Sequence, residues 1–210
     1  MQRSLIAEVE DAVSSGSPDQ RVETLRRVTD LFMGGADSFS EEHVGVFDDV
    51  ISRLAERIET KARVELASRL APVRNAPVTV VRALARDKSI EVCGPVLSQS
   101  PRLTEEDLLE VAQHHGQDRL LAISKRLSVS EAVSDVLVAR GDREVVRSVA
   151  RNEGARFSSA GYGKLVEQSA QDDELAVSVA GRRDISKAQF QAIVSKASEE
   201  VFKKLSASNP

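Results

Sequence analysis

The sequence predicts an all-α protein, a short right-handed α-solenoid of antiparallel helix pairs, with a closed helical bundle as the structural alternative. Ala, Val, Leu, Arg and Glu dominate the composition, whereas strand-forming aromatic residues are few, with no Trp, one Tyr and six Phe. Apolar residues recur at helical spacing between residues that favour helix ends. From Pro77 onward this pattern repeats about every 27 residues, which is shorter than the roughly 33 to 47 residues of common two-helix repeats. We therefore expect short helices joined by tight turns.

The N-terminal part of the chain reads as four helices. The first covers residues 2–14, and the second begins at Ser17, where the order Ser-Pro-Asp-Gln suits a capping box. That second helix runs to the glycine pair at 34–35. A third helix opens at Ser40, and Thr60 caps a fourth, which ends between Pro72 and Pro77.

The rest of the chain reads as alternating first and second helices of a repeat. First helices begin at intervals of 27, 26 and 28 residues, near Pro77, Thr104, Ser130 and Ser158. Second helices begin near Ser89, Gln117, Asp142 and Asp172. The pair Ile185-Ser186 then opens a longer last helix, from Lys187 to Leu205. Two short amphipathic helices cannot bury their apolar stripes alone, so each pair needs a neighbour on both sides.

The clearest copy of the repeat lies between Ser130 and Ser159. Ser130 and Asp142 are placed to cap its two helices. Gly141 is expected to end the first helix in the left-handed conformation, and Asn152 is expected to end the second. The second helix also carries a row of basic residues spaced by four: Arg143, Arg147 and Arg151.

Charge and pattern divide the chain into three predicted parts. Residues 1–39 form an acidic, capping N-terminal helical pair, residues 40–185 form the repeats, and residues 186–210 form a C-terminal capping helix and tail. Residues 1–60 hold six basic and thirteen acidic side chains, whereas residues 61–156 hold sixteen and thirteen. An acidic head and a mildly basic middle are not typical of a general nucleic-acid binder.

Several classes of protein are disfavoured by simple counts. The single cysteine, Cys93, excludes an internal disulfide framework and a cysteine zinc cluster. No apolar run has the length of a membrane span, and acidic residues follow Met1 too soon for a signal peptide. We therefore expect a cytoplasmic protein that does not bind membranes.

Residues from about Thr60 to Ser186 resemble a bacterial family, domain of unknown function 2336. The segments that carry this resemblance are Gly94-Pro95-Val96-Leu97, Leu103-Thr104, Leu108, Leu120-Leu121-Ala122-Ile123-Ser124, Leu127, Val129-Ser130, Val133-Ser134-Asp135, Val138-Ala139-Arg140-Gly141-Asp142 and Asn152-Glu153-Gly154-Ala155-Arg156-Phe157-Ser158. The resemblance implies HEAT-like helical repeats and brings no catalytic residues. Members of that family often continue beyond this length, which leaves two expectations for the last helix: that it caps the array, or that it is the point where a longer protein was cut.

Candidates for chemistry each have a simpler structural interpretation. Adjacent side chains on a helix point about 100° apart, so His114 and His115 do not form a joint metal site. Cys93 lies on an apolar helical face, where buried thiols are mostly small core residues. Gly161 is expected to let two helices approach closely while Tyr162 packs, and Asp135 is expected to bind the backbone of a neighbouring turn. We predict no catalytic residue, cofactor or metal.

The arginines are the remaining candidates for a binding surface. In a stack of repeats, corresponding positions line up into a ridge that could meet an acidic protein surface or phosphates. The alternative is a solvated face whose arginines pair with acids such as Glu144, Glu153 and Asp118. The predicted ridge consists of Arg82, Arg86, Arg126, Arg143, Arg147, Arg151, Arg182 and Arg183.

These observations favour a non-enzymatic scaffold that binds an unidentified protein partner. The alternative is a HEAT-like nucleic-acid-binding or DNA-repair-type protein that uses the basic ridge. That alternative is weaker because the chain is acidic overall and has no Trp to stack on a base.

Overall fold

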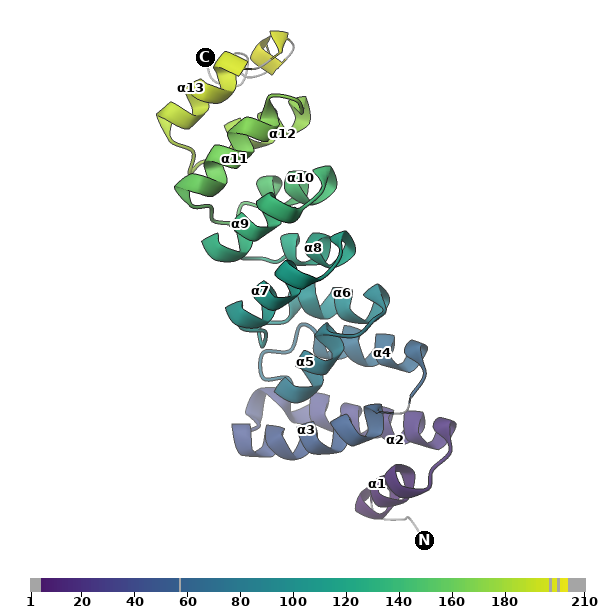
Figure 1. Ribbon diagram of the computed structural model, residues 1–210. Helices are drawn as coiled ribbons and strands as arrows, with labels where there is room; N and C mark the ends of the chain where they lie inside the picture. The colour runs from purple at the N-terminus through teal and green to yellow at the C-terminus, as the bar shows by residue number, and fades with distance from the viewer. Residues whose placement is uncertain (1–4, 57, 197, 200, 204–210) are drawn as a thin grey trace. The chain divides into compact units, whose positions relative to one another are not determined.

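The computed structural model describes residues 5–56, 58–196, 198, 199 and 201–203. The regular secondary structure of these residues is helical, apart from one isolated parallel bridge between Val129 and Ala155, so the all-α fold class is confirmed (Figure 1). The chain divides into two compact units, residues 1–104 and residues 105–210. The boundary between the units falls inside the region predicted to hold the repeats. Among the helices described, none has both the length and the apolar character needed to cross a membrane.

The first unit contains six α-helices and one short 3-10 helix within its described residues. Helices α1, α2 and α3 pack on one another. Helix α3 also contacts α5, and α4 contacts both α5 and α6. The elements are α1 (Leu5–Ser14), α2 (Pro18–Gly35), η1 (Ala36–Ser38), α3 (Glu41–Ala55), α4 (Thr60–Leu70), α5 (Val78–Ala85) and α6 (Ile90–Gln99).

A cluster of three phenylalanines fixes the antiparallel pair α2 and α3. The ring centroid of Phe32 lies 5.2 Å from that of Phe47 and 6.0 Å from that of Phe39, and the rings of Phe39 and Phe47 are 5.3 Å apart. Phe32 is fully buried. Aromatic contacts at these distances are worth about 0.5–1.5 kcal/mol beyond the area they bury. Half of the six phenylalanines of the chain are therefore gathered at this one contact.

The second unit consists of helices stacked in two rows. The first helices contact one another in the order α7, α9, α11 and α13, and the second helices in the order α8, α10 and α12 (Figure 1). Neighbouring members of the two rows also contact each other as pairs. The elements are α7 (Glu105–His114), α8 (Gln117–Ser124), α9 (Glu131–Arg140), α10 (Arg143–Arg151), α11 (Ser159–Ser169), α12 (Asp173–Ala180) and α13 (Lys187–Lys196).

Side-chain caps set the beginnings of these helices where the sequence predicts them. The hydroxyl of Ser130 accepts a hydrogen bond from the backbone N–H of Val133, and the carboxylate of Asp142 accepts one from Val145. A complete capping box joins Ser17 and Gln20 at the start of α2. Each such cap satisfies a donor that the first turn leaves without a partner, which stabilises a helix by about 1 kcal/mol.

The joint between α9 and α10 differs from the prediction. Gly141 has φ −66° and ψ 145°, an extended conformation and not the predicted left-handed one. Glycine is required there for space, because an added Cβ would lie 2.6 Å from Cγ1 of Val145 and nearer still to the carbonyl oxygen of Leu137. The tight turn brings α10 back against the end of α9, which leaves no room for a side chain.

Two further helix ends also differ from the prediction. Helix α4 is preceded by Glu59 as its N-cap residue, so Thr60 is the first helical residue and not the cap. The last helix does not run unbroken from Lys187, because α13 ends at Lys196 and Ser198 is not helical. The hydroxyl of Ser198 accepts from the N–H of Val201 and starts a separate short turn. The predicted end of that helix and the tail, residues 204–210, lie outside the described residues.

Side chains at the repeat joints bind the backbone of the preceding repeat. The amide of Asn152, after α10, donates to the carbonyl oxygens of Ser124 (2.8 Å) and Arg126 (2.7 Å), after α8. The guanidinium of Arg182, after α12, donates to Ala150 (3.1 Å) and Asn152 (2.8 Å), at the end of α10. Each joint therefore supplies partners for carbonyls that the previous helix end leaves open.

The predicted structural roles of Asp135 and Gly161 are confirmed. Asp135 of α9 accepts hydrogen bonds from the backbone N–H (3.3 Å) and the hydroxyl of Ser158, which starts α11. A Cβ on Gly161 would overlap the Asp135 carboxylate, so glycine permits this close approach of α9 and α11. Tyr162 packs in the core with 5% exposure.

Candidate functional site

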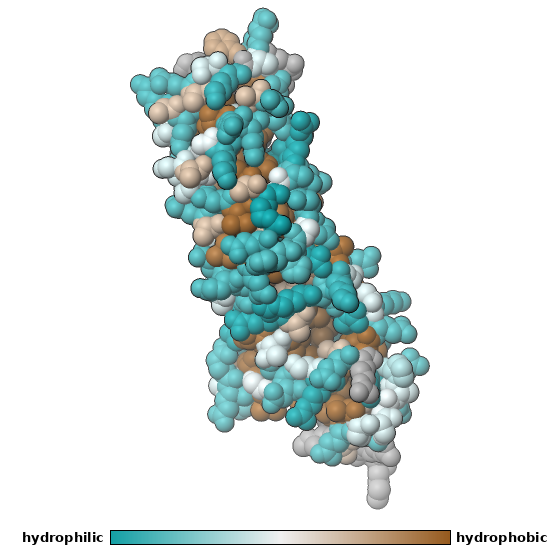
Figure 2. All heavy atoms as spheres, in the orientation of Figure 1, coloured by the Kyte–Doolittle hydropathy of each residue, from teal (hydrophilic) through white to brown (hydrophobic). Residues whose placement is uncertain are grey.

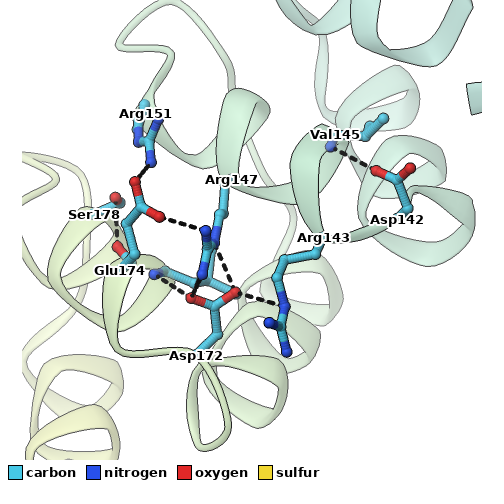
Figure 3. A network of polar contacts seen from close by, with 9 residues as sticks. Asp142, Arg143, Val145, Arg147, Arg151, Asp172, Glu174 and Ser178 are labelled. Atoms are coloured by element: carbon cyan, nitrogen blue, oxygen red, sulfur yellow. Dashed lines mark hydrogen bonds and ion pairs between the residues drawn. The ribbon is translucent and has the colours of Figure 1, made fainter. Parts of the chain in front are cut away.

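The three arginines of α10 form one row that faces the neighbouring helix α12. Figure 3 shows Arg147 between Arg143 and Arg151, with all three guanidinium groups directed toward acids at the start of α12. Residues four apart on a helix share one face. The opposite face of α10 carries Val145, Val146, Val149 and Ala150, all of them buried.

Arg147 and Asp172 form the central contact of this site. Nε and Nη2 of Arg147 lie 2.8 and 2.7 Å from the two carboxylate oxygens of Asp172, a bidentate arrangement. Asp172 is also the N-cap of α12 and accepts from the backbone N–H of Leu175 at 3.0 Å. One carboxylate therefore begins α12 and joins it to α10.

The surroundings of Asp172 keep its carboxylate ionised. Burial raises the pKa of this group, but hydrogen bonds from Arg147 and from the N–H of Leu175 outweigh burial and hold the pKa below its ordinary range. The hydrogen bond to Asp172 raises the pKa of Arg147 in turn. At neutral pH the pair is a fixed, charged element of the site.

Glu174 is the second acid that faces the arginine row. It pairs with both Arg147 and Arg151. Arg143 makes only a longer contact, with Nε 3.5 Å from Asp172, and its side chain is 69% exposed. The side chain of Arg151 is 50% exposed. The row therefore has a fixed centre and two solvent-exposed ends.

An open groove of about 540 Å³ runs along this face of the second unit. We call it the basic groove. Four of its lining side chains are basic and two are acidic, and Leu121 and Ser148 also line it. Its residues come from α8, α10 and α12 and from the turn after α8: Leu121, Lys125, Arg143, Glu144, Arg147, Ser148, Arg151 and Glu174.

A second cleft, of about 550 Å³, lies on the other side of the arginine row. Its wall combines Arg143 and Asp172 with residues of α11 and the turn after it, including Lys164, Glu167 and Gln171. Basic and acidic side chains alternate in this cleft, so it has no strong preference for one sign of charge. Arg143 lines both openings.

The other five arginines of the predicted ridge lie outside this row. Arg82 and Arg86 lie in the first unit, at the end of α5. Arg126 is half-buried, and burial lowers its pKa. Arg183 is exposed in the turn after α12. The structure thus groups three of the eight predicted residues, Arg143, Arg147 and Arg151.

Arg182 is used inside the fold and not on the surface. Its side chain is 6% exposed, and its Nε donates to the hydroxyl of Tyr162 (3.0 Å) and to Asp184 (2.9 Å). The guanidinium also lies 4.8 Å from the centre of the Phe157 ring. Burial lowers the pKa of Arg182, but the bonds to Asp184 and Tyr162 outweigh it and raise the pKa. A position at a helix end was not sufficient to predict an exposed arginine.

The acids that hold the row were not identified from the sequence as its partners. The sequence suggested pairing with Glu144 and Glu153, which lie close by along the chain, and with Asp118 of the preceding second helix. The structure uses Asp172 and Glu174, because stacking brings the next second helix alongside α10. The repeat period was the available signal, since Asp172 lies 25 residues after Arg147.

The candidates for chemistry occupy structural positions. Cys93 is fully buried in α6. His114 lies at the end of α7, where its Nδ1 contacts the carbonyl oxygen of Glu110 at 2.9 Å. Among the described residues, no group of three or more His, Cys, Asp or Glu side chains is arranged to hold a metal ion.

Comparison with known proteins connects this chain to one family. The family, described as an uncharacterised protein conserved in bacteria (DUF2336), matches residues 92–210, which is more than half of the chain and includes α10 and α12. No curated protein and no solved structure matches the chain. The chain therefore belongs to the DUF2336 family of bacterial proteins, as the resemblance in its repeats predicted.

Proposed function

We propose that this protein is a non-enzymatic helical-repeat scaffold that binds a protein partner through the basic groove. The observation that carries the proposal is the arrangement of the arginine row. Arg147 is held on both sides by carboxylates of α12, while Arg143 and Arg151 remain 69% and 50% exposed at either end. Charged side chains that are already oriented lose less entropy when a partner binds.

The chemistry of the basic groove favours carboxylates of a protein over phosphates. Arg143 and Lys125 are exposed cations, but Glu144 and Glu174 line the same groove. Binding to a nucleic-acid backbone depends on an excess of positive charge that releases counterions. A groove with a small excess of basic side chains instead suits a protein surface that presents a few carboxylates, and such complementarity mainly provides specificity and fast association.

The proposal also includes a cytoplasmic location and a regulatory or assembly role without chemistry of its own. It is supported by the structural use of Cys93 and His114 and by the repeat architecture, since stacked helical repeats generally present extended binding surfaces. The support from repeat architecture is an analogy with other proteins built from stacked helices. The arginine row is the observation that is specific to this chain.

A photo-crosslinking amino acid at Ser148, inside the basic groove, tests the proposal. The full chain is expressed in a bacterium, and the same amino acid at exposed Gly163 on α11 is the matched control. We expect a discrete cross-linked protein band from position 148 that is absent from position 163. The double variant Arg143→Glu, Arg151→Glu should abolish it. The same band from both positions, or no band at 148, contradicts the proposal.

A DNA-binding assay distinguishes the alternative function, nucleic-acid binding, from the proposed function. Duplex binding with a steep salt dependence that the same double variant removes would support the nucleic-acid hypothesis instead. We expect no such binding at physiological salt.

A further inference from the structure

The exposed cations of the basic groove stand at the two ends of the arginine row, on either side of Arg147, which is already paired with Asp172 and Glu174. Arg143 and Arg151 are eight residues apart on α10, which places their Cα atoms about 12 Å apart along the helix. Leu121 and Ser148 line the groove together with these cations. An occupant that matches this layout has two acidic side chains at a similar separation and an apolar side chain that can pack against Leu121.

The exposed face of α3 has this layout. We call it the acidic face of α3, and it consists of Glu42, Gly45, Val46 and Asp49. All four residues are exposed, and the side chain of Val46 is an exposed large apolar group at 62%. Glu42 and Asp49 are seven residues apart, about 10 Å along the helix.

Gly45 gives the acidic face of α3 a second unusual property. Glycine within a helix costs about 1 kcal/mol relative to alanine. Within this chain, a Cβ at Gly45 would meet no atom within 4 Å, so packing inside the molecule does not require glycine. The missing side chain lets another surface approach the backbone of α3 beside Val46.

We infer that the basic groove of one copy of this protein receives the acidic face of α3 of a second copy. The inference rests on the proposed function and names its partner. Glu42 and Asp49 would meet Arg143 and Arg151, and Val46 would lie against Leu121. The charge of the chain agrees with this pairing, because residues 1–60 hold thirteen acidic and six basic side chains. The contact joins two different surfaces, so it is heterologous and can continue from copy to copy.

Sedimentation of the full chain over a wide range of concentrations tests the inference. At low salt we expect the weight-average mass to rise with concentration. At about 1 M salt, where the Debye length is only ~3 Å, the rise should largely disappear. A chain that stays monomeric at every concentration and salt level overturns the inference.

Charge reversal on each surface identifies the contact. The groove variant Arg143→Glu, Arg151→Glu and the helix variant Glu42→Lys, Asp49→Lys should each weaken self-association by about tenfold or more. The control matched to the helix variant, Glu10→Lys, Glu23→Lys, changes the net charge by the same amount at exposed sites on α1 and α2 and should associate like the wild type. An equal loss of self-association in the control overturns the inference. Circular dichroism verifies that each variant is folded.

A mixing experiment gives the sharpest result. The groove variant keeps a native acidic face, and the helix variant keeps a native basic groove. Each alone should be monomeric, whereas an equimolar mixture should form a 1:1 dimer and nothing larger. A mixture that stays monomeric overturns the inference. If the cross-linker at Ser148 nevertheless captures a different protein, the proposed function stands while self-association is rejected.

Discussion

Arg147 of α10 and Asp172 at the start of α12 form a bidentate pair, with both carboxylate oxygens within 3.0 Å of the guanidinium. The side chain of Asp172 is 6% exposed, and it also caps α12 through the N–H of Leu175. Since one carboxylate performs two tasks, loss of this group should affect both the helix start and the contact between repeats.

The substitution Asp172→Ala should destabilise the second unit by about 1–3 kcal/mol, since it removes a helix cap and leaves Arg147 without its main partner. Urea unfolding measures this loss. Tyr162 is the only tyrosine and there is no tryptophan, so intrinsic fluorescence reports on the second unit. The control Gln171→Ala, at the exposed neighbouring position, should change stability by less than about 0.5 kcal/mol. Equal effects of the two substitutions would contradict the assigned role.

The contribution of Asp172 should also depend on pH. Its pKa is lower in the folded chain than its ordinary value, so the folded state favours the ionised form. The stabilisation is therefore present above pH about 4, the ordinary aspartate pKa, and is lost as the pH falls through the lower folded value. The difference in unfolding free energy between the wild type and Asp172→Asn should be largest near neutral pH and shrink in acid. A difference that does not change with pH would argue against an ionised pair.

Two glycines should respond oppositely to the same substitution. Gly141→Ala should destabilise by about 1–3 kcal/mol, because the new Cβ would overlap Leu137 and Val145. Gly163→Ala should stabilise by about 0.5–1 kcal/mol, because this position in α11 is helical and open to solvent. Thermal unfolding of the two variants checks the signs. Stabilisation by Gly141→Ala would contradict the tight joint between α9 and α10.

Two neighbouring arginines after α12 should differ in how much their substitution destabilises the chain. Arg182→Ala should destabilise by about 2–4 kcal/mol, because several backbone carbonyls and Asp184 lose a buried donor. Exposed Arg183→Ala should have an effect below about 0.5 kcal/mol. Chemical unfolding followed by circular dichroism compares them. Similar losses in the two variants would reject the distinction between a buried and a surface arginine.

Much of the helical pattern could be predicted from the sequence because its signals are local. Ser130 and Asp142 cap the helices that they were expected to cap, and α11 begins near Ser158 as expected, since a cap depends on residues only three positions apart. The close approach at Gly161 and the bond from Asp135 to the next turn were also predicted correctly.

Features that depend on stacking were harder to predict. The conformation of Gly141 depends on the space left by Val145, and the pairing of Arg147 depends on a helix 25 residues later. The burial of Arg182 depends on the end of α10, the segment that follows it and Tyr162 of α11, which all contact its guanidinium. Such contacts can be predicted from position along the chain only if the number of residues between equivalent positions of neighbouring repeats is known to within one residue.

The backward reach of Asn152 and Arg182 has a consequence for synthesis of the chain. The carbonyl oxygens that they bind lie 26 to 32 residues earlier. At the usual rate of about 5–20 residues per second, a newly made second helix waits roughly 1–6 s for the side chain that completes its end. During translation α8 and α10 are therefore each completed by a side chain of the following repeat.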